Sequence, residues 1–426
     1  MLRENQRRFK FDWITIILFL LLVGFGYVNI LSASQTGEIT GYFNTSQLYG
    51  KHLIFIGLSL VLIILILSLE AKFYERFASI IYLVAILSLI GLFIFGKDVN
   101  GARSWYGIGS MTIQPSEFAK FATALAVAKY ISDLQTNMKT LKDQIRVAAI
   151  IFFPALLILL QNDAGSTIVY LAFFFVFYRE GLQQVYLIVA LSLILLAVLS
   201  LKFGIAITAI IVTLVLTLRY FLRKKKRASI LQYLLVLFIS VGFAYGVKLF
   251  YNHGLKTHQQ NRISLWLRLE KDPIKLERMR KAEAYNLIQS EEAISSGHIT
   301  GKGFLQGTRT TGKFVPEQHT DYIFSTVGEE WGFVGSSFVI IAFVLLIIRI
   351  LYLAESQKSQ FSRVYGYGVA SILFVHFTIN IGMVMGLIPT VGIPLPFFSY
   401  GGSGLWGFTI LLFIFIKLDS NKINEW

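Results

Sequence analysis

Long apolar stretches separated by short polar breaks run along almost the whole chain. A hydrocarbon core about 30 Å thick is crossed by about 20 mostly apolar residues in a helix. Stretches close to this length lie at 13–33, 52–69, 76–96, 115–131, 147–161, 165–178, 184–201, 204–222, 229–250, 322–352, 364–386 and 402–417. The pattern predicts an all-α polytopic membrane protein with about twelve transmembrane helices.

Composition agrees with this fold class. Of 426 residues, 55% are hydrophobic and 15% are charged, whereas soluble domains are about 25% charged. A soluble enzyme, a disordered chain and a secreted disulfide scaffold are therefore excluded. The chain has no cysteine, so any chemistry falls to carboxylates, histidines or lysines. The formal charge of +15 on so apolar a chain favours a membrane surface over nucleic acid.

The basic residues predict the sidedness of the chain, because short cytoplasmic loops are rich in Lys and Arg. If the N-terminus is cytoplasmic, the inner ends of the spans hold just over half of these residues. They include the basic leader (Arg3, Arg7, Arg8, Lys10), Lys72, Arg76, Lys139, Lys142, Arg146, the run RKKKR at 223–227, Lys358 and Arg363. RKKKR lies inside only if both 184–201 and 204–222 cross the membrane, with their break at Lys202–Gly204. Both termini are then cytoplasmic, and the long loop 251–321 is outside.

Two outer segments differ in composition from the inner loops. Segment 97–116 is rich in glycine and aromatic residues, and segment 387–404 contains three of the seven prolines. We expect irregular backbone in both, and such backbone survives at membrane depth only where protein buries it or it lines a cavity. The two segments predict a polar pocket at the outer face.

Ionisable residues inside a span are expensive and therefore functional candidates. Glu117 and Lys120 share one helix face just after Pro115, which can open that helix. They would form either a functional polar pair or a structural ion pair, and the two interpretations are compatible. Asp163, at the junction of two spans, is best explained as a cap of the helix that begins near Ser166.

The outer loop holds further candidates. Asp272 precedes Pro273, and an Asp before a Pro is often merely a turn or helix-start signal. A charged, helix-like run follows at 274–284. Segment 301–321 is rich in glycine, and its basic side chains, Lys302, Arg309 and Lys313, could meet phosphate.

Other polar residues of this region are weaker candidates for a site or have a structural interpretation. His319 and Asp321 could ligate a metal, although two ligands are too few for a site of their own. Glu329 and Glu330 are more typical of packing or pairing than of catalysis. The residues alone leave open a transporter, a lipid-processing enzyme and a scaffold.

Five motifs in order resemble the SEDS family of bacterial shape, elongation, division and sporulation proteins. They are Asn100–Trp105, Gln114–Lys120, Gln161–Ser166, Pro316–Phe324 with Glu329-Glu330, and Pro394–Ser403. Asn380–Met383 and Gly392–Pro396 look more like its RodA elongation branch than its FtsW division branch. The resemblance implies one SEDS membrane domain over 1–426. It also implies a peptidoglycan glycosyltransferase of the bacterial cytoplasmic membrane that polymerises lipid II at the outer face. The expected partners are a class B penicillin-binding protein and other membrane proteins of the elongation complex.

The resemblance also assigns residues. The presumed catalytic group is the Asp of an Asp-Pro pair, here Asp272, acting as general base in an inverting transfer. The substrate-binding residues that we carry over or infer are Arg103, Glu117, Lys120, Asp163, Lys302, Lys313, His319, Asp321 and Ser399. A divalent cation, Mg²⁺ or Mn²⁺, could assist the diphosphate leaving group.

Two departures from the family pattern concern the loop and the spans. The insert 274–284 separates Asp272-Pro273 from Tyr285 and Gln289-Ser290, whereas relatives usually place glycines there. Family members typically have ten spans, so 184–222 is expected to be one extra helical hairpin. Two alternatives to the enzyme stay open: a lipid II flippase with Glu117, Lys120 and Asp163 along its path, and a noncatalytic scaffold for the penicillin-binding protein.

Overall fold

The computed structural model describes residues 11–35, 44–99, 101–109, 111–222 and 229–422. Three features used above lie outside the described residues: the basic leader, Asn100 and the RKKKR run. The sidedness inferred from the leader and the RKKKR run stays a prediction.

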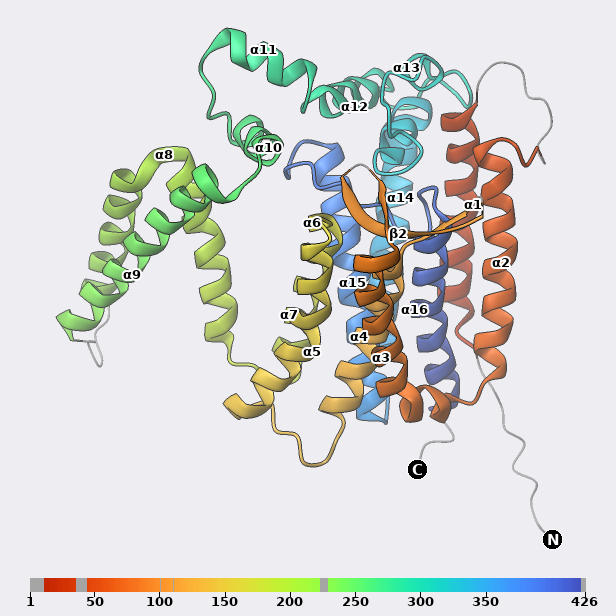
Figure 1. Cartoon of the computed structure of the whole chain (residues 1–426), viewed down its shortest axis with the longest axis horizontal. Helices are drawn as coiled ribbons and strands as arrows, with labels where there is room; N and C mark the ends of the chain where they lie inside the picture. Colours follow the sequence, from red (N-terminus) through yellow and green to blue (C-terminus); the bar gives the residue numbers. More distant parts are fainter. Residues whose placement is uncertain (1–10, 36–43, 100, 110, 223–228, 423–426) are drawn as a thin grey trace. The chain divides into compact units, whose positions relative to one another are not determined.

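Helices make up most of the described chain (Figure 1). Before a small sheet come α1 (Trp13–Ser34), α2 (Leu48–Ser68) and α3 (Ala71–Phe95). After it come α4 (Pro115–Ile131), α5 (Leu141–Leu160), α6 (Ala164–Val169), the 3₁₀ turn η1 (Tyr170–Ala172), α7 (Phe173–Arg179), α8 (Gln184–Leu222), α9 (Ile230–Leu249) and the π-helical turn η2 (Phe250–Gly254). The rest of the chain forms α10 (Thr257–Leu267), α11 (Pro273–Lys281), α12 (Tyr285–Ser296), α13 (Thr308–Thr311), α14 (Ile323–Glu355), α15 (Gln360–Val384) and α16 (Gly402–Asn421).

Within the described ranges, nine helices are long and apolar enough to cross a membrane. One of them, α8, is 39 residues long and is broken at Gly204, whose φ is 82°. The break lies at the predicted boundary Lys202–Gly204 and divides α8 into the two arms expected at 184–222. Two further apolar stretches of the prediction are shorter helices, α4 with 17 residues and Ala164–Arg179. The multi-pass helical fold is confirmed, and the number of crossings stays a prediction.

The sheet corrects the expectation of irregular backbone at 97–116. Strands β1 (Lys97–Val99), β2 (Ala102–Ile108) and β3 (Met111–Ile113) form an antiparallel sheet in the order β1-β2-β3. Tyr106 pairs with Ile113, and Lys97 pairs with Trp105. Aromatic and β-branched residues favour extended backbone, and here they outweigh the glycines that suggested a loop.

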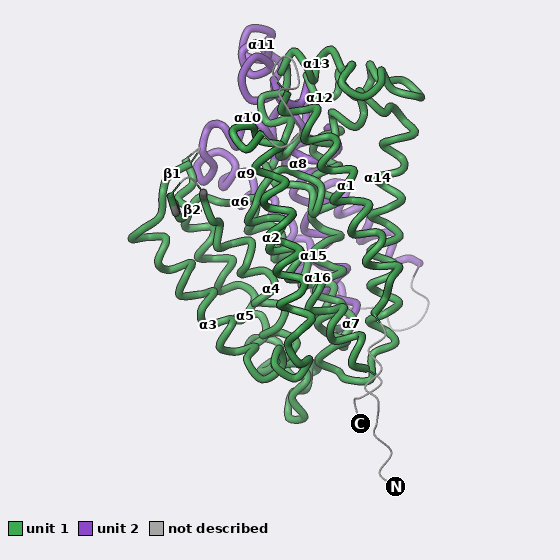
Figure 2. Tube along the Cα trace, turned by 90° about the vertical axis from the view of Figure 1, so that its right-hand side faces the viewer, with its two compact units in different colours: residues 1–182, 289–385, 391–426 green, residues 183–288, 386–390 purple. Residues whose placement is uncertain are grey.

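The described chain divides into two compact units (Figure 2). Unit 1 comprises residues 1–182, 289–385 and 391–426, and unit 2 comprises 183–288 and 386–390. The predicted outer loop 251–321 is therefore shared between the two units, with Asp272 in unit 2 and segment 301–321 in unit 1.

In unit 1, α15 and α16 form the centre of the helical bundle. Their most apolar windows are 78% buried, against 28% for α2 and 22% for α3. Helix α4 packs on α3, α15 and α16, and α1 packs on α14. The outer faces of α2 and α3 carry exposed apolar side chains such as Ile64 and Phe95, as suits a lipid-facing surface.

In unit 2, the two arms of α8 and the single helix α9 pack together. The rings of Tyr220 on α8 and Tyr233 on α9 meet edge to face with centroids 5.5 Å apart. A capping box at Ser229 and Gln232 begins α9. The helices α10 and α11 of the outer loop follow within the same unit.

Candidate functional site

The start of α4 places an ion pair inside unit 1. Pro115 occupies the first turn, as predicted, where its missing N–H costs nothing. Glu117 and Lys120 follow on one face and are 4% and 2% exposed. Lys120 Nζ lies 2.7 Å from Glu117 Oε1, so the predicted pairing of these two residues is confirmed.

A third residue, which the sequence reasoning missed, completes this cluster. His376 on α15 is buried, and its Nε2 lies 2.9 Å from Lys120 Nζ. The ring of Phe408 on α16 lies 4.9 Å from the same ammonium group. An ammonium has three donors and no acceptor, so His376 Nε2 must accept, and the ring proton belongs on Nδ1, 3.4 Å from the carbonyl of Pro394. The cluster therefore links α4, α15 and α16.

His376 could have been found from the sequence by the same signal that pointed to Glu117 and Lys120. It is an ionisable side chain in an apolar stretch. Glu117 Oε2 is buried without a hydrogen-bond partner among the described residues. The cluster thus presents one unsatisfied carboxylate oxygen, while its ammonium is fully occupied.

Asp163 is the N-cap of α6. Its carboxylate accepts from Ser166 N at 2.9 Å and from Ser166 Oγ at 2.8 Å. The predicted capping role is confirmed, with the helix beginning at Ala164. The second carboxylate oxygen also accepts from Gln114 Nε2 at 3.0 Å, and the backbone N–H of Gln114 donates to Ser403 Oγ. Asp163 therefore ties together the N-terminal ends of α6, α4 and α16.

The segments 319–321 and 391–401 pack against each other in unit 1. Tyr400 N donates to the carbonyl of His319 at 2.9 Å. Ser399 Oγ donates to the carbonyl of Thr320 at 2.7 Å, and Asn380 Nδ2 donates to the carbonyl of Asp321 at 2.8 Å. Three residues predicted as site members are thus brought together, chiefly through their backbone.

This region does not assemble a metal site from protein ligands. The described part of the chain has no group of three or more His, Asp and Glu side chains that could hold an ion. Mg²⁺ is commonly held by one or two carboxylates together with substrate phosphates, so the divalent cation that could assist the leaving group stays a prediction. Burial lowers the pKa of His319 below its usual 6.5; nearby Glu317 opposes this and Lys313 adds to it.

Lys302 is committed to an internal carboxylate. Its Nζ lies 2.7 Å from Glu329 Oε1, and Glu329 also accepts from the backbone N–H groups of Arg309 and Thr310 at 2.9 and 2.8 Å. Two backbone amides and the ammonium of Lys302 are thus gathered around Glu329, which confirms the pairing role expected for that residue. Substrate binding by Lys302 stays a prediction, and it would require this pair to open.

The same glycine-rich segment approaches α14 closely. A Cβ on Gly332, whose φ is 61°, would lie 2.3 Å from the backbone nitrogen of Gly301. The neighbouring carboxylate Glu330 is buried and accepts from Ser32 Oγ on α1. Glycine is therefore required at 332, and the segment is fixed to the bundle.

Two predicted cationic residues lie at the surface. Arg103 on β2 donates to the carbonyls of Gly96 and Ile94 at 3.1 and 3.3 Å, which leaves guanidinium donors for other partners. Lys313 is exposed and has a positive φ of 52°. Both can reach an anion in solution.

Asp272 lies in unit 2 as the N-cap of α11, with Pro273 in the first turn. Its Oδ1 accepts from Ile274 N at 3.0 Å, and its own N–H donates to Glu270 Oε1 at 3.2 Å. The predicted helix start is confirmed. The carboxylate is exposed, and Oδ2 has no hydrogen bond or ion pair within the described residues. A water-facing carboxylate with one free oxygen can accept a proton.

Three cationic residues, Lys271, Lys275 and Arg278, lie close to Asp272 in the sequence. Lys275 Nζ lies 2.6 Å from Glu270 Oε2, and this hydrogen bond holds the pKa of Glu270 below its ordinary value. Lys271 and Arg278 are exposed and have no such partner within the described residues.

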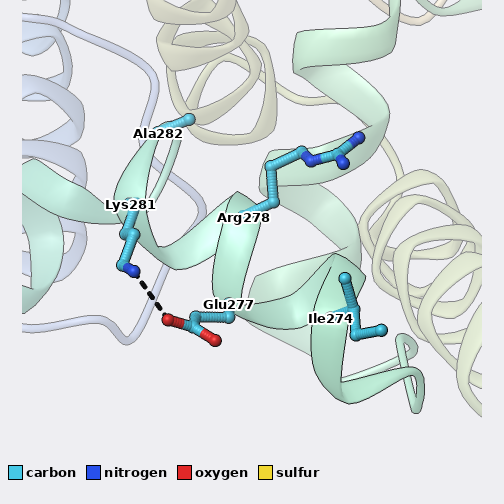
Figure 3. Close-up of a pocket in the computed structure, with 5 residues that line it drawn as sticks. All are labelled: Ile274, Glu277, Arg278, Lys281 and Ala282. Carbon is cyan, nitrogen blue, oxygen red and sulfur yellow. Dashed lines mark hydrogen bonds and ion pairs between the residues drawn. The ribbon is translucent and has the colours of Figure 1, made fainter.

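Next to Asp272, α11 forms one side of an open hollow. Its volume is about 490 Å³, and it is lined by Ile274, Glu277, Arg278, Lys281 and Ala282 (Figure 3). Figure 3 shows the Glu277–Lys281 pair, at 2.6 Å, with Arg278 turned away from it. A hollow lined by one helix cannot enclose a substrate by itself.

A family model and curated relatives match most or nearly all of the chain. The FtsW/RodA/SpoVE model, described as "Cell cycle protein", matches residues 12–424. The "Peptidoglycan glycosyltransferase RodA" of Treponema pallidum is 32% identical over 440 residues, covering 97% of this chain and 98% of the relative. The "Peptidoglycan glycosyltransferase MrdB" of Escherichia coli K12 is 32% identical over 351 residues, covering 82% and 80%.

Solved structures share the fold. A chain described under "Structural coordination of polymerization and crosslinking by a peptidoglycan synthase complex" is 24% identical, with a TM-score of 0.71 over 98% of this chain and 100% of that one. The RodA rod shape determining protein of Thermus thermophilus is 22% identical, with a TM-score of 0.63 over 97% and 98%. The match over 12–424 shows that this chain belongs to the FtsW/RodA/SpoVE family of cell cycle proteins.

Proposed function

We propose that this chain is a peptidoglycan glycosyltransferase that polymerises lipid II at the outer face of the bacterial cytoplasmic membrane. The observation that carries the proposal is the exposed Asp272 carboxylate at the start of α11, with one oxygen unengaged, in a chain of this family. Two relatives at 32% identity, matched over 98% and 80% of their length, are named as such glycosyltransferases. The fold-level neighbour from a peptidoglycan synthase complex agrees with this class of activity.

The reaction requires a base. Lipid II is an α-linked glycosyl diphosphate and the new glycosidic bond is β, so the transfer inverts at the anomeric carbon. The acceptor hydroxyl oxygen forms the new bond to that carbon while the bond to the diphosphate oxygen breaks. Asp272 takes the hydroxyl proton, and the electron pair leaves on the diphosphate. General-base help of this kind contributes roughly 10²–10⁴-fold.

The leaving group requires cations. Polyprenyl diphosphate develops negative charge as its bond breaks, and fixed positive groups stabilise that charge. Lys120 is already saturated by Glu117, His376 and Phe408. We therefore assign its main role to holding the bundle together. Exposed cations beside Asp272 in the sequence include Lys271 and Arg278 of the same unit. Arg103 and Lys313, predicted as substrate-binding, are exposed in unit 1.

The proposal includes sidedness and partners. Both termini are cytoplasmic and the loop 251–321 is periplasmic or extracellular, following the distribution of basic residues. A class B penicillin-binding protein supplies crosslinking, together with other membrane proteins of the elongation complex. No nucleic acid is involved.

The test is a reconstitution of the chain with its transpeptidase partner in liposomes containing labelled lipid II. The proposal predicts β-linked glycan strands and released polyprenyl diphosphate from wild type, and formation of both about 10²–10⁴-fold slower from Asp272→Asn. Movement of labelled lipid II across the bilayer without strands would support a flippase instead. Full polymerisation by the partner alone would support a scaffold.

A further inference from the structure

The turn of the broken helix α8 touches the end of α10. Lys202, two residues before the break at Gly204, donates from Nζ to the carbonyl of Leu267, the last residue of α10. The last carbonyls of a helix have no partner within it and carry partial negative charge. A lysine ammonium is the side-chain group that suits this position.

Burial along α8 is concentrated at the same turn. Of its 39 residues, the two that are buried are Ser200 and Thr208, on either side of Lys202 and Gly204. The remainder of the two arms carries exposed apolar side chains. The hairpin packs on α9, and its two buried residues flank the turn at which Lys202 meets α10. A charged residue in so apolar a helix is used at that turn.

Helix α10 is held on another side by segment 386–390 of the same unit. Arg262 Nη1 donates to the carbonyl of Thr390 at 3.2 Å, and Trp266 Nε1 donates to the carbonyl of Leu387 at 3.0 Å. Its C-terminus is closed by Arg268 in the left-handed conformation, φ 54°, and by Leu269 N donating to Ser264 O at 2.8 Å. The end of α10 is thus a fixed point.

A short run of hydrogen bonds joins this fixed point to Asp272. Glu270 follows directly after the closed end, and its Oε1 accepts from the N–H groups of Lys271 and Asp272 at 3.1 and 3.2 Å. Lys275, on the first turn of α11, binds the other oxygen of Glu270. The position of Asp272 is therefore set from both sides, by the end of α10 and by the start of α11.

We propose that the α8 hairpin is a support for the base, and that Lys202 is a positioning residue which fixes Asp272 through the C-terminus of α10. The proposal rests on the function proposed above and gives the α8 hairpin a role in it. Because Lys202 acts through the backbone of α10, it affects the rate of the chemical step and leaves substrate binding unchanged. A shift of about 1 Å in a catalytic group can cost about 100-fold in rate.

The test compares Lys202→Met, Lys202→Arg and a control, Lys248→Met, in the full chain reconstituted with its transpeptidase partner. Lys248 is an exposed lysine near the end of α9 in the same unit. The readouts are kcat and KM for lipid II polymerisation, and hydrogen exchange of the amides at 264–276. Lys202→Met should lower kcat about 10- to 100-fold with KM within about twofold, and should speed exchange at 267–272. Lys202→Arg, which keeps a donor, should recover most of kcat, and Lys248→Met should match wild type.

The outcomes separate this inference from the proposed function. Asp272→Asn, measured beside these variants, tests the base itself, and full activity of that variant overturns the function assigned to Asp272. If Asp272→Asn is inactive while Lys202→Met keeps wild-type kcat and exchange at 267–272, the positioning role of Lys202 is wrong. Loss of kcat that Lys202→Arg fails to recover, without faster exchange at 267–272, also overturns it.

Discussion

Lys120 Nζ lies 2.9 Å from His376 Nε2 and 2.7 Å from Glu117 Oε1. The three residues come from α4 and α15, and all are buried. The three side chains thus form a buried polar cluster within unit 1, in which Glu117 Oε2 has no hydrogen-bond partner among the described residues. The ammonium is satisfied by protein, so the cluster first of all holds helices together.

Removing one charge of this pair should be worse than removing both. Lys120→Met leaves Glu117 buried without a counter-charge, which we expect to lower the free energy of unfolding by about 3–5 kcal/mol. The double variant Glu117→Gln, Lys120→Met should be more stable than Lys120→Met alone. Denaturant unfolding in detergent measures both. Equal destabilisation of the single and double variants would show that the pair is not the source of the effect.

His376 should act as a hydrogen-bond acceptor for Lys120. Replacement by Phe removes the acceptor and leaves a buried donor unsatisfied, at a cost of about 1–3 kcal/mol. His376→Gln keeps an acceptor and should lose less. Unfolding of the two variants under the same conditions gives the comparison, and a Phe variant as stable as the Gln variant would contradict the contact.

Asp163 should contribute mainly as a helix cap. Asp163→Ala should cost about 1 kcal/mol of stability, and Asp163→Asn, which keeps a side-chain oxygen, should cost little. Polymerisation should be measured on the same samples. If Asp163→Asn is stable yet inactive, the carboxylate also contacts substrate, as the resemblance implied.

His319 should make stability depend on pH. Burial lowers its pKa below 6.5 in the folded protein, so the unfolded chain binds a proton more readily. Its contribution to stability is present above pH 6.5 and is lost as pH falls through the lower, folded value. Thermal unfolding of wild type and His319→Gln between pH 5 and 7.5 should therefore differ in slope below about pH 6.5. Parallel curves would contradict a lowered pKa of this half-buried imidazole.

Hydrophobic periodicity predicted the membrane fold because spans are set by length and polarity alone. The break at Gly204, the Asp163 cap and the Glu117–Lys120 pair also followed from local rules, since each involves neighbours in sequence. His376 was missed because its partner is 256 residues away. The sheet at 97–113 was missed because its glycines suggested a loop, while pairing between three short strands decided the backbone. The occupation of Lys302 by Glu329 is likewise a long-range contact that composition does not reveal.

The central claim is that Asp272 is the base for glycan polymerisation. The most direct measurement is the rate of strand formation from lipid II by the purified chain with its transpeptidase partner, wild type against Asp272→Asn. Asn keeps an oxygen for the Ile274 cap, so the fold of α11 is preserved while the proton acceptor is lost. We expect a loss of about 10²–10⁴-fold in rate with unchanged thermal stability. A wild-type rate in the Asn variant would contradict the account.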